Sequence, residues 1–176
     1  MPNIIAKKSD PLNRPNITSL EDQRCQADYQ TTMLEHTNKY RSLYGMIPLQ
    51  VSQKLQYVAL QAAQRSYPLN SIAKAVESFL LFSTVVHYGL DNNISSIECK
   101  THAVNRASDW YEYWVPLYKD SEYTYLGCAI SIVNSTGYQV CYLQSDKGAD
   151  NLELNIVPPG VYIDLESYSD SFWTQF

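Results

Sequence analysis

The sequence predicts an α+β domain, because its period of hydrophobicity changes once along the chain. Apolar residues recur at helical spacing up to about Tyr113 and at every second position in later segments. Helices and strands do not alternate in the manner of βαβ units, which would have predicted a parallel sheet. The 176 residues, 45% hydrophobic and 18% charged, suit one folded domain with a sizeable core.

Four helices are expected in the earlier part, over the approximate ranges 29–44, 52–66, 72–86 and 103–113. Gly45 follows the first helix, and Pro48 prevents its continuation. Pro68 is expected to end the second helix, because a proline lacks the amide hydrogen that a helix interior needs. The segment "LDNNISS" (90–96) predicts a loop between the third and fourth helices.

Strand alternation begins after residue 120. The segments Tyr125–Val133 and Tyr138–Leu143 alternate apolar residues with others, and the turn residues Asn134–Gly137 separate them. This pattern is typical of an antiparallel hairpin. Further extended segments are expected at Leu152–Val157 and Val161–Leu165.

Charge and hydropathy exclude two classes of partner. The net charge is −5 and the basic residues form no stripe, whereas a nucleic-acid-binding protein needs a basic footprint. The longest apolar run, Phe79–Val86, is too short to span a bilayer. The N-terminal residues lack the basic-then-apolar pattern of a signal peptide, which predicts a cytoplasmic protein. Unconventional secretion and a missing signal peptide are the alternatives.

The four cysteines are Cys25, Cys99, Cys128 and Cys141. Cys128 and Cys141 lie nearly opposite each other across the predicted hairpin, so they are the candidate disulfide pair. Reduced thiols are nevertheless expected, because a protein without a signal peptide stays in a reducing compartment. Three sequons for N-linked glycosylation, at Asn16, Asn93 and Asn134, are interpreted as chance occurrences.

The stretch "LEHTNKYRSLYGMIPL", residues 34–49, carries Asn, Arg, Gly and Pro at intervals that the apolar face of a core helix does not require. It resembles the start of the CAP superfamily, roughly H-N-x-x-R-x-x-H-G-x-x-P-L, with Thr37 and Tyr44 at the two His positions. The matching residues here are Asn38, Arg41, Gly45, Pro48, Leu49, Leu55 and Ala59.

Later segments are similar to the family's motifs in the same order. "AVNRASDWY" carries Trp110 and Tyr111, "YLGCAISI" carries Gly127, and "GYQVCYL" resembles the last core strand. The segment "NLELNIVPPG" is similar to the end of the Golgi-associated plant pathogenesis-related group. Intracellular members of that group and helminth venom allergen-like proteins look most similar.

The resemblance implies an α-β-α sandwich with a central antiparallel sheet. Residues 1–25 are rich in Pro, Asn and Asp without periodicity, which predicts an N-terminal tail. The expected CAP/SCP domain covers 26–160, and 161–176 form a C-terminal extension. The resemblance also implies an open cleft, in which relatives use two His and two Glu to bind a divalent metal.

The cleft residues are poorly matched in this chain. His87 comes after an apolar segment, which favours a packed His over a ligand. His102 and Glu98 are four residues apart, which favours a solvated helix pair. Glu112 stands one position early in the W-Y-x-E motif, and the H-F-T-Q motif is absent. These four are weak metal candidates, so the sequence predicts no metal, no other cofactor and no catalytic residue.

The resemblance therefore indicates a non-enzymatic protein that binds a lipid or sterol or acts as an interaction and immunomodulatory module. Its partners would be a lipid or sterol, a second copy in a homodimer, or a host or membrane-surface protein. Two alternatives stay open. One is a metal-dependent hydrolase with a rebuilt cleft, and the other is a self-associating scaffold that uses the residues after Val161.

Overall fold

The computed structural model describes residues 20–79, 81, 83–94, 98–113 and 122–146. Its elements, in chain order, are α1 (Leu20–Ser42), β1 (Gln50–Val51), α2 (Gln53–Leu69), α3 (Ile72–Glu77), β2 (Thr84–Asp91), α4 (Cys99–Tyr113), β3 (Tyr123–Val133) and β4 (Thr136–Ser145). The predicted α+β class is confirmed. No helix in the described ranges is long and apolar enough to cross a membrane.

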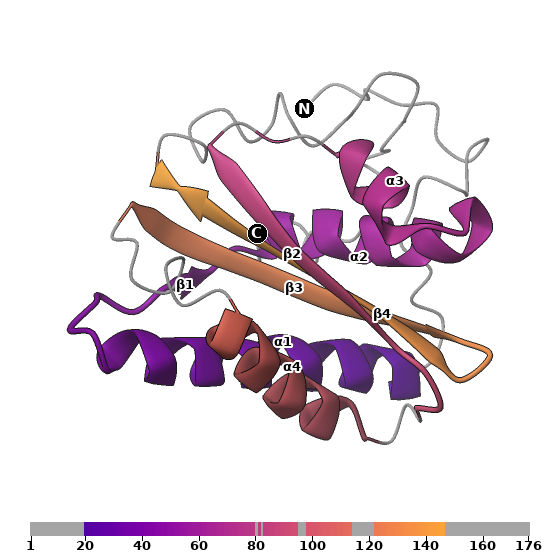
Figure 1. Ribbon diagram of the computed structural model, residues 1–176, viewed down its shortest axis with the longest axis horizontal. Coiled ribbons are helices and arrows are strands. Elements are labelled where there is room, and N and C mark those ends of the chain that lie inside the picture. The colour runs from indigo at the N-terminus through magenta and orange to yellow at the C-terminus, as the bar shows by residue number, and fades with distance from the viewer. Residues whose placement is uncertain (1–19, 80, 82, 95–97, 114–121, 147–176) are drawn as a thin grey trace.

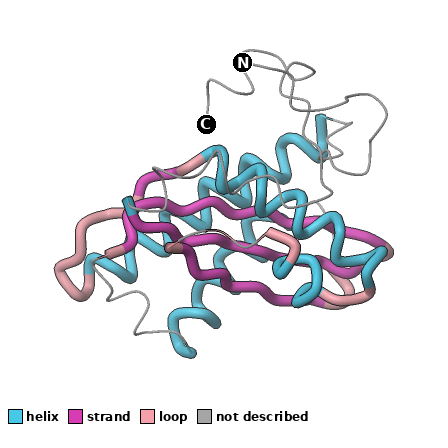
Figure 2. Tube along the Cα trace, turned by 90° about the horizontal axis from the view of Figure 1, so that it is seen from above, coloured by secondary structure: helices cyan, strands magenta, loops and turns pink. Residues whose placement is uncertain are grey.

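The strands form one sheet in the order β1-β3-β4-β2. The predicted hairpin of β3 and β4 is confirmed and lies in the middle of this sheet, and Cys128 faces Cys141 in its register. Helices α1 and α4 cover one face and α2 and α3 the other, which confirms the α-β-α sandwich (Figure 1). The strands run side by side between these helices (Figure 2). The sheet is not wholly antiparallel, however, because the two-residue β1 runs parallel to β3.

Each face of the central hairpin contributes to a separate core. Ala129, Val140 and Tyr142 pack in a cluster with α2 and α3. Cys128 and Ile130 point to the opposite side and pack in a cluster with α1 and α4. This division follows from the period of two in a strand, which sends successive side chains to opposite faces.

Gly127 marks the closest approach between the sheet and α2. A Cβ atom on this residue would collide with the backbone of Leu55 and Gln56. The amide of Ser52 also donates to the carbonyl of Leu126 at 2.9 Å, and the Ser52 hydroxyl accepts from the amide of Leu55 as the N-cap of α2. The family-motif glycine therefore allows the start of α2 to lie directly on β3.

The outer edge of β3 is closed by side chains of α1. Strand β1 pairs only with Tyr125 and Leu126, and no other strand among the described residues pairs with the rest of that edge. There the Gln30 side chain accepts from the amide of Cys128 at 2.5 Å, and Gln26 bonds both the amide and the carbonyl of Ile130. The two glutamines thus replace the backbone groups that a longer β1 would have supplied.

Several predicted boundaries are wrong. Helix α1 begins at Leu20, inside the segment predicted as a tail, and Pro68 lies within α2 rather than ending it. Helix α2 ends one residue later, where Asn70 takes the left-handed conformation (φ 52°). The predicted segments Leu152–Val157 and Val161–Leu165 lie outside the described residues.

The third predicted helix is also wrong in its second half. Helix α3 ends at Glu77, and Val86 and His87 belong to strand β2. The apolar spacing appeared helical beyond the end of α3 because Ile72, Val76 and Val86 all contact the same core cluster. Apolar residues of a helix and of the following strand therefore looked like one continuous helical face. The β-branched pair Val85–Val86 favours the strand.

Two disulfides cross-link the chain. Cys128 and Cys141 are bonded with their Cα atoms 4.1 Å apart, and Cys25 is bonded to Cys99 with a Cα separation of 5.5 Å. The predicted proximity of Cys128 and Cys141 is confirmed, whereas the predicted reduced state is wrong, since no cysteine is free. The Cys25–Cys99 bond joins α1 to α4 across 74 residues, a pairing that no local pattern indicates.

Candidate functional site

The family-motif residues of α1 build the turn between α1 and β1. Asn38 accepts from the amide of Leu49 at 2.7 Å and donates to its carbonyl at 3.1 Å. The buried Arg41 donates through Nε to the carbonyl of Ile47 at 3.1 Å. Gly45 has a φ of 69°, a conformation that costs glycine little. The spacing of Asn38, Arg41 and Gly45 in "NKYRSLYGMIPL" therefore allows these residues to hold the turn, residues 43–49, against the end of α1.

This turn presents apolar side chains to solvent, and we call Leu43, Ile47 and Val51 the apolar turn. Their exposed fractions are 67%, 81% and 40%. Single exposed apolar residues are normal on a protein surface. Three such residues lie within nine positions, in and next to a turn whose backbone is bonded to the half-buried Asn38 and the buried Arg41.

An aromatic contact joins the end of α1 to the end of α4. Tyr40 stacks on Tyr111 with ring centroids 4.3 Å apart, and the hydroxyls of Tyr44 and Tyr111 are 2.9 Å apart. Tyr44 occupies a family His position, and Tyr111 belongs to the family's W-Y motif. A pair of hydrogen-bonded phenols therefore lies where relatives carry an imidazole.

His87 packs on the other residue of that motif. It lies on β2, is 5% exposed, and its ring meets the buried Trp110 edge-on with centroids 5.2 Å apart. Burial away from water lowers the pKa of His87 from 6.5 to about 4, because the charged imidazolium loses its hydration. At neutral pH this side chain is uncharged and forms part of the contact between β2 and α4.

The His87 pKa predicts a pH dependence of stability. The unfolded chain takes up the proton near pH 6.5 and the folded protein only near pH 4, so stability is complete above pH 6.5 and falls as the pH drops through that window. The expected loss is about 1 kcal/mol per pH unit. Denaturant unfolding at pH 7, 5.5 and 4.5 measures it, and His87→Gln should flatten the profile. Equal slopes in both proteins would contradict this assignment.

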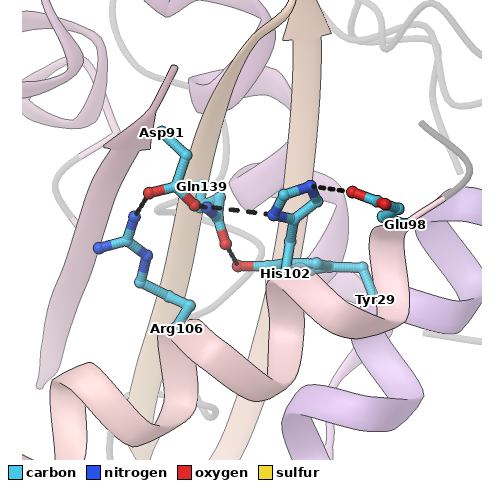
Figure 3. A network of polar contacts seen from close by, with 6 residues as sticks. All are labelled: Tyr29, Asp91, Glu98, His102, Arg106 and Gln139. Carbon is cyan, nitrogen blue, oxygen red and sulfur yellow. Dashed lines mark hydrogen bonds and ion pairs between the residues drawn. The ribbon is translucent and has the colours of Figure 1, made fainter. Parts of the chain in front are cut away.

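A polar network centred on Asp91 fastens α4 to the sheet (Figure 3). One carboxylate oxygen of Asp91 accepts from the Arg106 guanidinium and the other accepts from the Gln139 amide. Gln139 in turn accepts from the hydroxyl of Tyr29 at 2.6 Å. The network therefore connects β2, α4, β4 and α1, and both oxygens of the Asp91 carboxylate are occupied.

His102 lies between two carboxylates of this region. Its Nδ1 is 4.0 Å from Asp91 and its Nε2 is 3.9 Å from Glu98, whose side chain is 60% exposed. Both distances exceed that of a hydrogen bond. The guanidinium of Arg106 also stands over the Trp110 ring, 5.8 Å from its centroid, which links this network to the His87 contact.

The structure brings together only one pair of the four metal candidates. Glu98 and His102 contact each other, His87 lies on β2 against Trp110, and Glu112 is exposed near the end of α4. Among the described residues, no group of three or more His, Cys, Asp or Glu side chains could hold a metal ion. The expected lack of a metal site stays a prediction.

Four residues of the network were missed in the sequence: Tyr29, Asp91, Arg106 and Gln139. The spacing of Glu98, His102, Arg106 and Trp110 places them on one face of α4 and could have indicated a polar face packed on the sheet. Asp91 carried no such signal, because its segment was predicted as a loop.

The chain is similar to known proteins in its structure, but its sequence matches no family profile and no curated protein. The structure titled BmVAL-1 is similar at a TM-score of 0.52 and 13% identity, over 67% of this chain and 77% of its own. Na-ASP-1 is similar at a TM-score of 0.50 and 12% identity, over 66% of this chain.

This chain spans only 38% of the length of Na-ASP-1. An extracellular SCP-domain protein from Bacillus anthracis is also similar, at a TM-score of 0.49 and 12% identity, over 70% of this chain and 43% of its own. At these identities the likeness concerns the fold. A particular likeness to the intracellular, Golgi-associated group stays a prediction. In its helices and its sheet, the chain has the fold of the CAP, or SCP, domain proteins.

Proposed function

We propose that this chain is a non-enzymatic binding module that takes a lipid, a sterol or a fatty acid, at the apolar turn. The observation that supports this is a rigid turn that leaves Leu43, Ile47 and Val51 exposed. Burying apolar surface stabilises a complex by roughly 25 cal/mol per Å². Because the Asn38 and Arg41 contacts already fix the turn, binding loses little backbone entropy.

The apolar residues of α3 and of the segment just after it add no support to this proposal. Ile72, Val76 and Phe79 are buried in the core with α2, so packing accounts for them. The apolar turn is different, because nothing among the described residues covers Ile47, which is 81% exposed.

The polar candidates favour a binding role over catalysis. A general base needs a side chain that can reach a substrate proton. Asp91 is bonded through both oxygens, and His87 is packed against Trp110 in the interior. Glu112 is exposed, but no described contact orients it. These arrangements hold the helices on the sheet, which supports a scaffold for binding.

The two disulfides support an oxidising compartment, such as the secretory pathway or the extracellular space. Structural disulfides persist there and are rare in the cytosol. The Cys25–Cys99 and Cys128–Cys141 bonds are both buried, which is typical of structural rather than reactive pairs. We therefore propose secretion in place of the cytoplasmic location that the sequence predicted. Homodimer formation and contacts with host or membrane-surface proteins stay predictions.

Titration of the purified chain with a fluorescent sterol and a fluorescent fatty acid tests the lipid-binding proposal. The double variant Leu43→Ser/Ile47→Ser should weaken binding by about tenfold or more, since each side chain contributes about 1–2 kcal/mol when buried. Leu90→Ser is the matched control, because Leu90 is an exposed apolar residue on β2, away from the turn. It should leave affinity unchanged.

Absence of binding by either probe would remove the lipid-binding proposal. Equal affinity in the turn variant and the Leu90→Ser control would show that the ligand binds elsewhere. Calorimetric titration with zinc addresses the alternative function. Stoichiometric zinc binding that disappears in His102→Ala or His87→Ala would favour the metal-dependent hydrolase.

A further inference from the structure

The tip of the central hairpin carries an N-linked glycosylation sequon whose Asn is exposed. Asn134 and Ser135 form the two-residue connection between β3 and β4, with Val133 paired to Thr136 below them. Both connecting residues are exposed and Thr136 is half-buried. Figure 1 shows this turn at one end of the central hairpin, at the lower right of the view. An attached sugar there would point into solvent.

Turn geometry explains one residue of the sequon. Asn134 and Ser135 have φ values of 52° and 64°, the left-handed conformation of a type I′ hairpin turn. Asn is favoured in that conformation, so its presence alone indicates no modification. The turn does not require a hydroxyl residue at 136, since that position already belongs to strand β4.

The disulfides supply an independent observation. Cys128 and Cys141 are bonded within the same hairpin, and Cys25 is bonded to Cys99. In eukaryotic cells, the compartment that forms disulfides is also the one in which sugars are transferred to Asn-x-Ser/Thr. In such a cell, a chain that acquires these two bonds meets the transferase while carrying this sequon.

We propose that Asn134 is an N-linked glycosylation site. The Asn134 side-chain nitrogen forms a bond to the anomeric carbon of an oligosaccharide carried on a polyprenyl diphosphate. The bond from that carbon to the diphosphate oxygen breaks, the lipid diphosphate leaves with the electron pair, and one amide proton passes to solvent. The step involves no oxidation or reduction.

The folded turn can accommodate the product. The amide of Ile94 donates to the carbonyl of Ser135 at 2.8 Å, so the turn is held to the segment after β2 by its backbone rather than by the Asn134 side chain. The buried side chain of Ile94 lies under Gly137 and fixes the strand next to the turn. A glycan on Asn134 extends from this fixed base without displacing a core residue.

Peptide mass spectrometry on the full chain, exported by eukaryotic cells with both disulfides formed, tests the site. Enzymatic removal of N-glycans in heavy-oxygen water should convert Asn134 to isotope-labelled aspartate. Asn70 is the internal control, since it is also exposed and left-handed (φ 52°) but has Ile72 two positions later, so it should remain unlabelled.

Two variants of the turn separate the sequon from the turn geometry. Thr136→Val removes the hydroxyl while keeping a β-branched side chain, and it should abolish labelling at Asn134. Ser135→Gly keeps the sequon and relieves the left-handed Ser135, and it should retain labelling that depends on the glycan-removing enzyme. Unmodified Asn134 in the exported, disulfide-bonded wild type would overturn the proposal. Labelling that persists in Thr136→Val would overturn it as well.

Discussion

Replacing Cys25 and Cys99 together by alanine is expected to lower the free energy of unfolding by about 4 kcal/mol. The bond closes a sequence separation of 74 residues, and the loop-entropy relation predicts a loss of that size when such a loop opens in the unfolded chain. The other bond, between Cys128 and Cys141, closes a separation of only 13, for which the same relation predicts about 3 kcal/mol. Denaturant unfolding of both double variants measures the difference.

The order of the two effects is the informative result. The unfolded-state account would be contradicted if the Cys128→Ala/Cys141→Ala variant lost more stability than the variant of the longer loop. If either variant fails to fold, the wild-type protein can be compared with and without reductant. Reduction should then lower its denaturant midpoint by an amount that reflects both bonds.

Asp91→Ala is expected to cost about 2–3 kcal/mol of stability. The change leaves the Arg106 guanidinium and the Gln139 amide, which is fully buried, without their shared acceptor. Breaking one partner of a buried ion pair costs more than the pair contributes, because the remaining charge stays desolvated. The Asp91 side chain is 31% exposed, so water compensates part of the loss.

A double-mutant cycle isolates this network from general effects of removing a carboxylate. Arg106→Met in the Asp91→Ala background should recover part of the lost stability, since it removes the orphaned charge. Asp109→Ala is the matched control on the exposed face of α4 and should change stability by less than about 0.5 kcal/mol. A loss in Asp91→Ala no larger than in this control would mean that the network contributes little.

The central hairpin could be predicted because both of its signals were local. Strand alternation and a turn segment stood next to each other in the sequence, and the structure places β3 and β4 in the middle of the sheet. The motif of α1 could also be recognised in the sequence, because Asn38, Arg41 and Gly45 belong to or contact a turn only a few residues away. Features that depend on contacts between residues close in sequence could therefore be predicted.

The missed features all depend on contacts between distant segments. Gln139 bonds Tyr29 across 110 residues, and Cys25 meets Cys99 only because α1 and α4 lie on the same face. Val86 was predicted to be helical because it is apolar at a helical interval from the residues of α3. It is apolar because it packs against the same core cluster as α3, although it belongs to a strand. In each case the feature depends on how the helices pack on the sheet. The periodicity of the sequence carries no information about that packing.

The glutamines that close the edge of β3 affect how copies of this protein meet. An uncovered strand edge is a template on which another chain can add a strand, and such addition starts aggregation. Gln26 follows Cys25 directly, so the bond to Cys99 also holds the side chain that covers Ile130. Reduction of that bond would remove the covalent link between the start of α1 and α4, next to the glutamine that covers Ile130. The disulfide therefore lies directly beside the contact that protects this edge of the sheet.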